Sequence, residues 1–221
     1  MNKLILKTAI ITLVSAISVS VMAICAITLF FPEKTARATA RMGMYGVSAN
    51  FQEIAYNRAP SIDGLGKLID YAVASENYAL LRKHCSKMLS AKNFQKYAEY
   101  RDGQAGENVT GAYAQYVAGS YAIALYHGGK EEGALEVAAK AVSGGYPVNN
   151  AVQYLLYEGA GEGDKTLLLS LAEYFTAKYE ELLATSETAF LAPSVALDAA
   201  YAYQQLGKNY QTEYALWLSR A

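Results

Sequence analysis

The residue types that most often carry enzyme chemistry are scarce in this chain. Histidine occurs only at His84 and His127, and cysteine only at Cys25 and Cys85. A Ser-His-Asp or Cys-His arrangement would have to use one of those histidines, because imidazole is the general base in both. The sequence also has neither the GxSxG pattern of a nucleophile elbow nor the HExxH pattern of zinc proteases.

The adjacent His84 and Cys85 do not have the spacing of a metal site. Neighbouring residues on a helix point about 100° apart, whereas two ligands of one metal usually lie one helical turn apart. No CxxC pair or Cys/His zinc spacing occurs. Cys85 instead continues an apolar stripe at helical spacing, formed with Tyr78, Leu81, Met88 and Leu89. We therefore predict structural roles for His84 and Cys85, and no metal site.

The other candidate motifs have plainer explanations. The stretch 159–163 is glycine-rich, but a phosphate loop needs a strand before it and a Lys-Ser/Thr pair after it. It is typical of a flexible turn between helices. The paired carboxylates Glu131-Glu132 and Glu180-Glu181 fit solvated or helix-capping positions. We predict that the protein is not an enzyme, with no catalytic residue and no cofactor.

Charge argues against nucleic acid as a partner. Residues 1–31 contain only two charged residues, Lys3 and Lys7, which leaves 17 basic and 20 acidic residues in the rest of the chain. A nucleic-acid-binding domain gains most of its affinity by neutralising phosphates with clustered Lys and Arg. The nearly neutral composition therefore excludes this function class.

An apolar segment near the N-terminus predicts a membrane helix. Residues 9–31 contain no charge, proline or glycine. As a helix this segment is about 34 Å long, enough to cross a hydrocarbon layer about 30 Å thick. The alternative is a cleaved signal peptide, since Ala38-Thr39-Ala40 has the form of a cleavage site. A signal peptide usually has a shorter apolar region, so we favour an uncleaved signal anchor over residues 1–31.

The orientation of this anchor follows from its position more than from its charges. The positive-inside rule nearly cancels between the two flanks. The charged residues concerned are Lys3 and Lys7 before the segment, and Glu33, Lys34, Arg37 and Arg41 after it. A signal anchor at the extreme N-terminus favours a cytoplasmic N-terminus. We therefore expect a single-pass membrane protein whose domain is extracytoplasmic.

After the anchor, apolar residues recur at helical spacing, and no segment alternates as a strand would. We predict an all-α fold with a partly helical juxtamembrane segment over 32–60 and a helical domain over 61–221. Ser75 is the expected N-cap of a helix over Tyr78 to Leu89, and Asp164 that of a later helix. One helix is expected after Asn108 as far as Tyr126, and another is expected to end at 144–147. The last helix is expected to bury Tyr210, Tyr214, Trp217 and Leu218.

Turns near Ser75, Gly129, Glu162 and Gly207 indicate about four to five antiparallel helical hairpins. The stretch 121–147, YAIALYHGGKEEGALEVAAKAVSGGYP, places a glycine at the hairpin turn and a proline at its end. Its second helix carries small residues at Ala134, Ala138 and Ala141. The stretch 199–219 is a weaker match. With these features the chain resembles a divergent tetratricopeptide (TPR) protein, which implies an α-solenoid behind the transmembrane helix.

The resemblance to TPR domains also implies a function and a site. In that family, the first helix of each hairpin lines a groove that receives a peptide or a partner protein. Mapped onto this sequence, the groove residues are Tyr116, Ile123, Tyr126, His127, Leu197, Tyr201 and Gln204. The expected function is thus a membrane-anchored interaction scaffold, held in the bilayer by residues 9–31. The alternatives are a structural subunit of a membrane complex without an open groove, and a secreted helical domain after signal cleavage.

Overall fold

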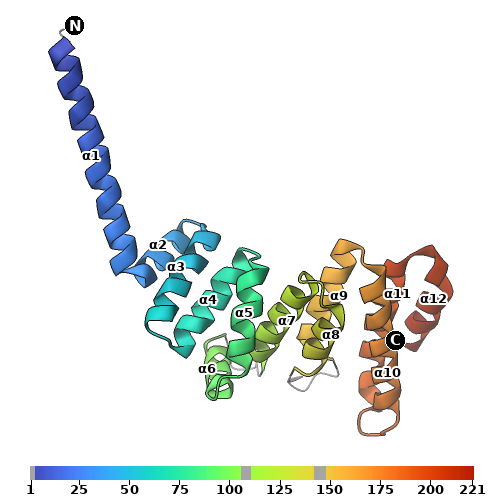
Figure 1. Ribbon diagram of the computed structural model, residues 1–221. Helices are drawn as coiled ribbons and strands as arrows, with labels where there is room; N and C mark the ends of the chain where they lie inside the picture. The colour runs from blue at the N-terminus through green and yellow to red at the C-terminus, as the bar shows by residue number, and fades with distance from the viewer. Residues whose placement is uncertain (1–2, 106–110, 142–147) are drawn as a thin grey trace. The chain divides into compact units, whose positions relative to one another are not determined.

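Helices are the only regular elements among the residues that the structure describes (Figure 1). The computed structural model describes residues 3–105, 111–141 and 148–221. The expected all-α class is confirmed for these ranges. The predicted helix start at Asn108 and the predicted helix end at 144–147 lie outside the described residues. The α-helices are α1 (Lys3–Phe30), α2 (Pro32–Arg41), α3 (Tyr45–Arg58), α4 (Ile62–Ala74), α5 (Tyr78–Leu89), α6 (Phe94–Ala105), α7 (Ala112–Tyr126), α8 (Glu131–Ala139), α9 (Asn150–Glu162), α10 (Lys165–Leu183), α11 (Ala192–Leu206) and α12 (Gln211–Arg220).

The chain divides into two compact units, Met1–Glu76 and Asn77–Ala221. The first unit therefore contains α1 to α4. The second begins at the N-cap of α5 and contains every later element. The helical domain predicted to begin at residue 61 thus has its first helix, α4, in the first unit.

In the first unit, α1 provides the membrane-length element. Its segment Ile10–Phe30 is long and apolar enough to cross a bilayer, and it is the one such helix in the described part of the chain. A signal sequence near an N-terminus has the same length and composition. Apolar side chains along this segment, such as Leu13 and Met22, are exposed, as expected of a helix whose partner is lipid.

Residues 32–60, predicted to be partly helical, form α2 and α3 in the first unit. These two helices pack against each other, and α3 also packs against α4. The hydroxyls of Thr39 on α2 and Ser48 on α3 hydrogen-bond at 2.8 Å. The buried amide of Gln52 on α3 donates to the backbone carbonyl of Gly64 on α4 at 3.1 Å. These partly buried polar contacts help to fix the pairing of α2 with α3, whose buried residues are mostly small or polar, and of α3 with α4.

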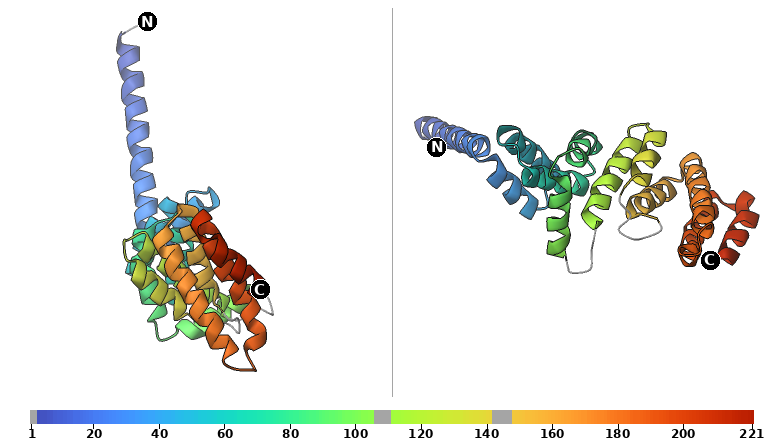
Figure 2. Two further views of the ribbon diagram at one scale, coloured as in Figure 1. Left: turned by 90° about the vertical axis from the view of Figure 1, so that its right-hand side faces the viewer. Right: turned by 90° about the horizontal axis from the view of Figure 1, so that it is seen from below.

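The core of the second unit is built largely from leucine and alanine. The buried side chains of Leu168, Leu171 and Phe175 on α10 lie among the alanines of α11. Small residues allow two helices to approach closely, and α10 and α11 lie side by side over their length (Figure 2). Trp217 of α12 covers the end of this cluster and is buried as predicted.

Two predictions near helix ends are wrong: Ser75 as an N-cap, and Ala141 as a residue of the second hairpin helix. Ser75 ends α4 rather than starting α5: its hydroxyl donates to the Tyr71 carbonyl one turn back. The N-cap of α5 is Asn77, whose side chain accepts from the Leu80 amide at 3.1 Å. Helix α8 ends at Ala139, so Ala141 lies beyond it. The residue that starts α10 is Asp164, as predicted.

The glycine-rich stretch before α10 is helical for most of its length, contrary to the predicted turn over 159–163. Helix α9 continues to Glu162, and only Gly163 leaves it, with φ of 68°. A Cβ on Gly159 would lie 2.9 Å from Cδ2 of the buried Leu167 on α10, so this glycine allows α9 to pack closely against α10. At the end of the chain, Leu218 is 49% exposed and not buried as predicted, while Tyr210 and Tyr214 are half-buried.

Candidate functional site

Helix α9 connects α7 to α11 through side chains on successive turns. Near its start, the buried Gln115 of α7 accepts a hydrogen bond from the Asn150 amide at 3.0 Å. Near its end, Glu158 Oε1 lies 2.5 Å from Nε2 of His127, which follows α7 directly. These two contacts hold α7 against α9 at both ends of the interface.

On its other side, α9 contacts α11 through a polar pair and an aromatic pair. Gln153 donates to Asp198 at 3.3 Å. One turn further along both helices, the rings of Tyr157 and Tyr201 meet edge-to-face, with centroids 5.7 Å apart. Burial raises the pKa of the Asp198 carboxyl, and the hydrogen bond from Gln153 offsets part of that increase. The pair is therefore held in a partly desolvated position between the two helices.

Four side chains make up what we call the α9–α11 apolar face: Tyr154 and Tyr157 of α9, which are exposed, and the exposed Leu197 and half-buried Tyr201 of α11. Tyr154, Tyr157 and Leu197 are 41%, 58% and 52% exposed, although each is a large apolar side chain. Tyr154 and Tyr157 are three residues apart on α9, and Leu197 and Tyr201 are four apart on α11, so each pair shares one side of its helix. The contact between Tyr157 and Tyr201 joins the two pairs.

A glycine on α7 positions this face. A Cβ on Gly119 would lie 2.6 Å from Cδ2 of Tyr154 and 3.3 Å from the Cα of Ala151. Only a glycine therefore allows α7 to approach α9 this closely with the Tyr154 ring lying over the crossing point.

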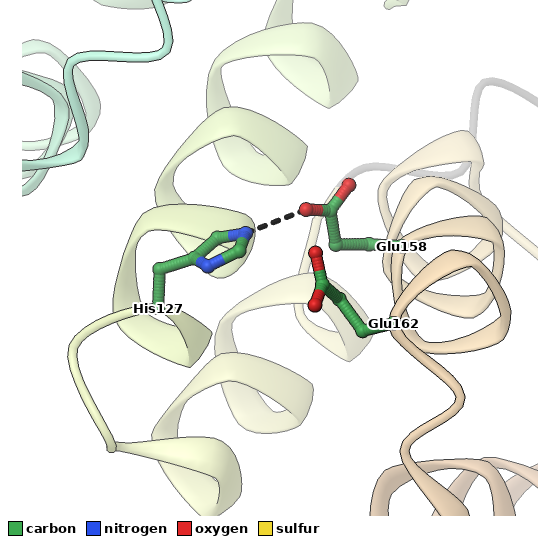
Figure 3. A group of neighbouring side chains, drawn as sticks. All are labelled: His127, Glu158 and Glu162. Carbon is green, nitrogen blue, oxygen red and sulfur yellow. Dashed lines mark hydrogen bonds and ion pairs between the residues drawn. The ribbon is translucent and has the colours of Figure 1, made fainter.

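Beside the apolar face lies a polar cluster around His127 (Figure 3). The imidazole stacks on the Tyr78 ring, with centroids 4.0 Å apart, and contacts the edge of Tyr126 at 5.2 Å. On the α9 side, Glu158 and Glu162 extend toward it from neighbouring turns, and the ligand-type atoms of these three residues all lie within 4.8 Å of one another.

Tyr126 is itself held in place by the start of α10. Its hydroxyl donates to Asp164 Oδ2 at 3.0 Å, and the other oxygen of this carboxylate accepts from the amides of Thr166 and Leu167. The carboxylate that caps α10 thus also fixes the tyrosine beside His127.

The residues assigned to a groove by the TPR resemblance lie in different surroundings. Tyr126 and His127 contact each other, and Tyr201 belongs to the α9–α11 apolar face with the exposed Leu197. Gln204 is exposed one turn further along α11, and Ile123 is half-buried on α7. Tyr116 packs against Tyr113 at the opposite end of α7 from His127.

Sequence reasoning did not select the α9 side of this site. Tyr154, Tyr157, Glu158 and Glu162 all come from α9, whose last residues were predicted to form a turn over 159–163. Glu158 and Glu162 are four residues apart, the spacing that places two side chains on one helix face. The pair could have been found from the sequence had the helix been extended through Gly159.

Comparisons with models of protein families, with curated proteins and with solved structures found no match to this chain.

Proposed function

We propose that this protein is a membrane-anchored, TPR-like scaffold that binds an apolar segment of a partner protein at the α9–α11 apolar face, without catalysing a reaction. The observation that carries the proposal is that Tyr154, Tyr157 and Leu197 are exposed on two helices that the contact between Tyr157 and Tyr201 joins. Large apolar side chains that stay exposed together on a folded surface are typical of protein interaction sites.

The composition of this face suits a peptide or a partner helix. Tyrosine is enriched at interfaces because its ring provides contact area while its hydroxyl remains able to hydrogen-bond. The polar groups at the rim, Gln204 on α11 and the His127–Glu158 pair, would orient the bound chain. Energetically dominant contacts concentrate in such a centre surrounded by a polar edge.

Paired helices with small residues at their crossings support the TPR-like part of the proposal. Helix α8 follows α7 after a turn in which Gly129 has φ of 69°, and α12 follows α11 after Gly207 with φ of 93°. Ala134 and Ala138 of α8 are fully buried against α7, in the positions that the resemblance assigns to small residues. If each pair is one hairpin, α7, α9 and α11 are the first helices of successive hairpins and would together form the binding side.

The membrane part of the proposal rests on α1. Its segment Ile10–Phe30 is long and apolar enough to span a bilayer and lies near the N-terminus. This position favours a signal anchor with the domain on the extracytoplasmic side. A partner at this face would therefore be another membrane or envelope protein.

Site-specific photo-cross-linking in native membranes tests this function. A photoreactive phenylalanine derivative is placed at Tyr157, at Leu197 or, as a control, at Leu216 on α12, which is 47% exposed. We expect one protein to cross-link from both positions on the face and not from the control. The captured partner is then purified, and its affinity is measured against the full-length chain.

A matched pair of double variants makes the affinity measurement specific. Tyr157→Ala with Leu197→Ala removes the centre of the face, and Leu216→Ala with Leu218→Ala removes two leucines that are about equally exposed elsewhere. We expect the first variant to weaken binding by at least about 30-fold, since the loss of even one hot-spot side chain costs about 2 kcal/mol. The second variant should bind as the natural chain does. Equal weakening, or cross-links only from Leu216, would reject this face as the binding site and favour a structural subunit.

A further inference from the structure

His127, Glu158 and Glu162 bring three metal-ligating groups together from two helices (Figure 3). We propose that they bind one divalent transition-metal ion of the Zn²⁺ type, with the imidazole Nε2 and one oxygen from each carboxylate as ligands. This inference goes beyond the peptide-binding function, because its ligand is a metal ion, although His127 and Glu158 also lie at the rim of the α9–α11 apolar face.

Both sides of the cluster are positioned by the fold. His127 immediately follows the last residue of α7, and its ring is held between the stacked Tyr78 and the edge of Tyr126. Glu158 and Glu162 are one turn apart on α9, so their carboxylates lie on the same side of that helix. The contact between Gln115 and Asn150 fixes the spacing of α7 and α9 at the other end.

The charges of the cluster favour a cation. Two carboxylates four residues apart on a helix repel each other, and a single imidazole hydrogen-bonded to Glu158 can offset only part of that repulsion. A divalent ion placed between the three groups would convert the repulsion into attraction on both carboxylates. No covalent bond to carbon is made or broken: the neutral imidazole binds the ion through the lone pair of Nε2 and keeps its one ring proton on Nδ1.

The donor set selects the class of metal. An imidazole nitrogen with two carboxylate oxygens suits Zn²⁺ and its first-row neighbours, whereas Mg²⁺ and Ca²⁺ prefer oxygen ligands alone. Ligands of one Zn²⁺ lie about 2.0–2.2 Å from the ion. In a tetrahedral site such ligands lie about 3.4 Å from one another. The ligand atoms now lie within 4.8 Å of one another, and rotation of the half-buried Glu158 and the exposed Glu162 side chains would bring them to that spacing. Three protein ligands leave a fourth position for water or for a group from another molecule.

Zinc titration of the full-length chain in detergent micelles, prepared without a polyhistidine tag, tests the proposal. Competition with a chromophoric chelator should show one Zn²⁺ bound per chain, and millimolar Mg²⁺ should not displace it. Because His84 is buried and His127 is the only other histidine, the imidazole signals in a ¹H–¹³C spectrum should change at one residue only.

Two charge-matched variants identify the ligands. Glu162→Gln removes one ligand and keeps the His127–Glu158 contact, whereas Glu180→Gln makes the same change of charge at an exposed position on α10. We expect Glu162→Gln to weaken Zn²⁺ binding at least tenfold, since even outer-shell partners of a metal contribute about 10–100-fold. Glu180→Gln should bind as the natural chain does. No Zn²⁺ binding by the natural chain, or equal affinity in Glu162→Gln and Glu180→Gln, would overturn the site.

Discussion

At the scale of single residues, Cys85 has the clearest chemical consequence. It lies on the buried side of α5, and burial raises the pKa of its thiol from 9.0 to about 12. Only the thiolate reacts with alkylating agents. At pH 8, the thiolate fraction of Cys85 is therefore about 1000-fold smaller in the folded chain than in the unfolded one.

We predict that Cys85 resists iodoacetamide at pH 8 until the chain unfolds. The measurement uses Cys25→Ser, which leaves one thiol, and follows the mass of the protein with and without denaturant. A variant that adds Ser186→Cys at an exposed position should be modified once, rapidly, without denaturant. Rapid modification of Cys85 in the native chain would contradict the burial.

The raised pKa of the Cys85 thiol also implies that folding stability decreases as pH rises above 9.0, because the thiol of the unfolded chain ionises there while that of the folded chain does not.

Asp198 gives a second prediction for a single residue, because folding raises the pKa of its carboxyl whereas it lowers the pKa of most carboxyls. Burial raises the pKa of its carboxyl in the folded chain, so its contribution to stability is fully present at low pH and is lost as pH rises through the folded value. We predict that Asp198→Asn, which keeps an acceptor for Gln153, raises the melting temperature at pH 7 by about 1–3 °C. The gain should vanish near pH 3.5.

The control for Asp198 is an acidic residue with a favourable role. Asp164 caps α10 and accepts from Tyr126. Asp164→Asn keeps one capping oxygen but removes the negative charge at the helix N-terminus and the oxygen that accepts from Tyr126, so it should lower the melting temperature at pH 7. If Asp198→Asn lowers it as well, the ionised carboxyl of Asp198 is stabilising and the assigned cause of its pKa is wrong.

Residue-level roles could be predicted from the sequence where they follow from periodicity. The burial of Cys85 follows from its place on an apolar stripe, and His84 beside it is buried too. The convergence of His127 with Glu158 could not be predicted in this way, because the two residues are 31 apart and meet only when α7 and α9 pack. Tyr157 and Tyr201 are likewise brought together by helix packing alone.

At the scale of elements, Asn149 joins two helices at one point. Its Oδ1 accepts from the Val152 amide and starts α9, while its Nδ2 donates to the carbonyl of Ala138 at 2.9 Å and to that of Ala141 at 3.3 Å. The side chain is buried, so nothing in solvent replaces it. Removing it would leave the Ala138 and Ala141 carbonyls and the Val152 amide without this partner.

We predict that Asn149→Ala lowers the free energy of unfolding by about 2–4 kcal/mol, from the lost N-cap and the buried carbonyls together. Asn77→Ala provides the comparison, because Asn77 caps α5 through one hydrogen bond and is only half-buried. Its loss should decrease the stability by about 1 kcal/mol. Urea unfolding of both full-length variants measures the difference, and equal effects would show that the link between α8 and α9 contributes little.

Helix identity was predictable from apolar spacing, but helix ends depended on which polar side chain reached a free amide. Asp164 was recognised because it directly precedes a long apolar-periodic segment. Ser75 and Asn77 are both good N-cap residues, and the sequence does not say which of them has the required backbone conformation. The glycines of α9 led to the wrong prediction of a turn, because Gly159 lies within the helix and allows close contact with Leu167.

At the scale of the whole molecule, the division of the chain at Glu76 was not predictable. The turn near Ser75 has the composition of any hairpin connection, yet α4 packs with α3 and belongs to the first unit. Which neighbour a helix packs against depends on the fit of whole surfaces, and local sequence does not encode that fit. The apolar length of α1, by contrast, is a property of one continuous segment and could be predicted from the sequence.

The N-terminal helix leads to the last prediction. If α1 is an uncleaved anchor, the chain should remain in the membrane pellet after alkaline carbonate extraction and should have the intact mass of 23.9 kDa. Val19→Arg combined with Val21→Arg should release it, because these residues flank the centre of the segment Ile10–Phe30 and each arginine near the centre of a spanning helix costs about 2.5–3.5 kcal/mol. Exposed Leu216→Arg on α12 is the control and should leave the chain in the pellet.

Cleavage as a signal peptide makes the opposite prediction for the same sample. The mature chain would then begin after the small residue Ala40, its mass would fall accordingly, and carbonate would extract it. Ala40→Trp would block such cleavage and restore the full mass, whereas an anchored chain would gain only the mass of the substitution. The two outcomes differ in both mass and fractionation, and a cleaved product would remove the membrane anchor from the proposed scaffold while leaving the α9–α11 apolar face unchanged.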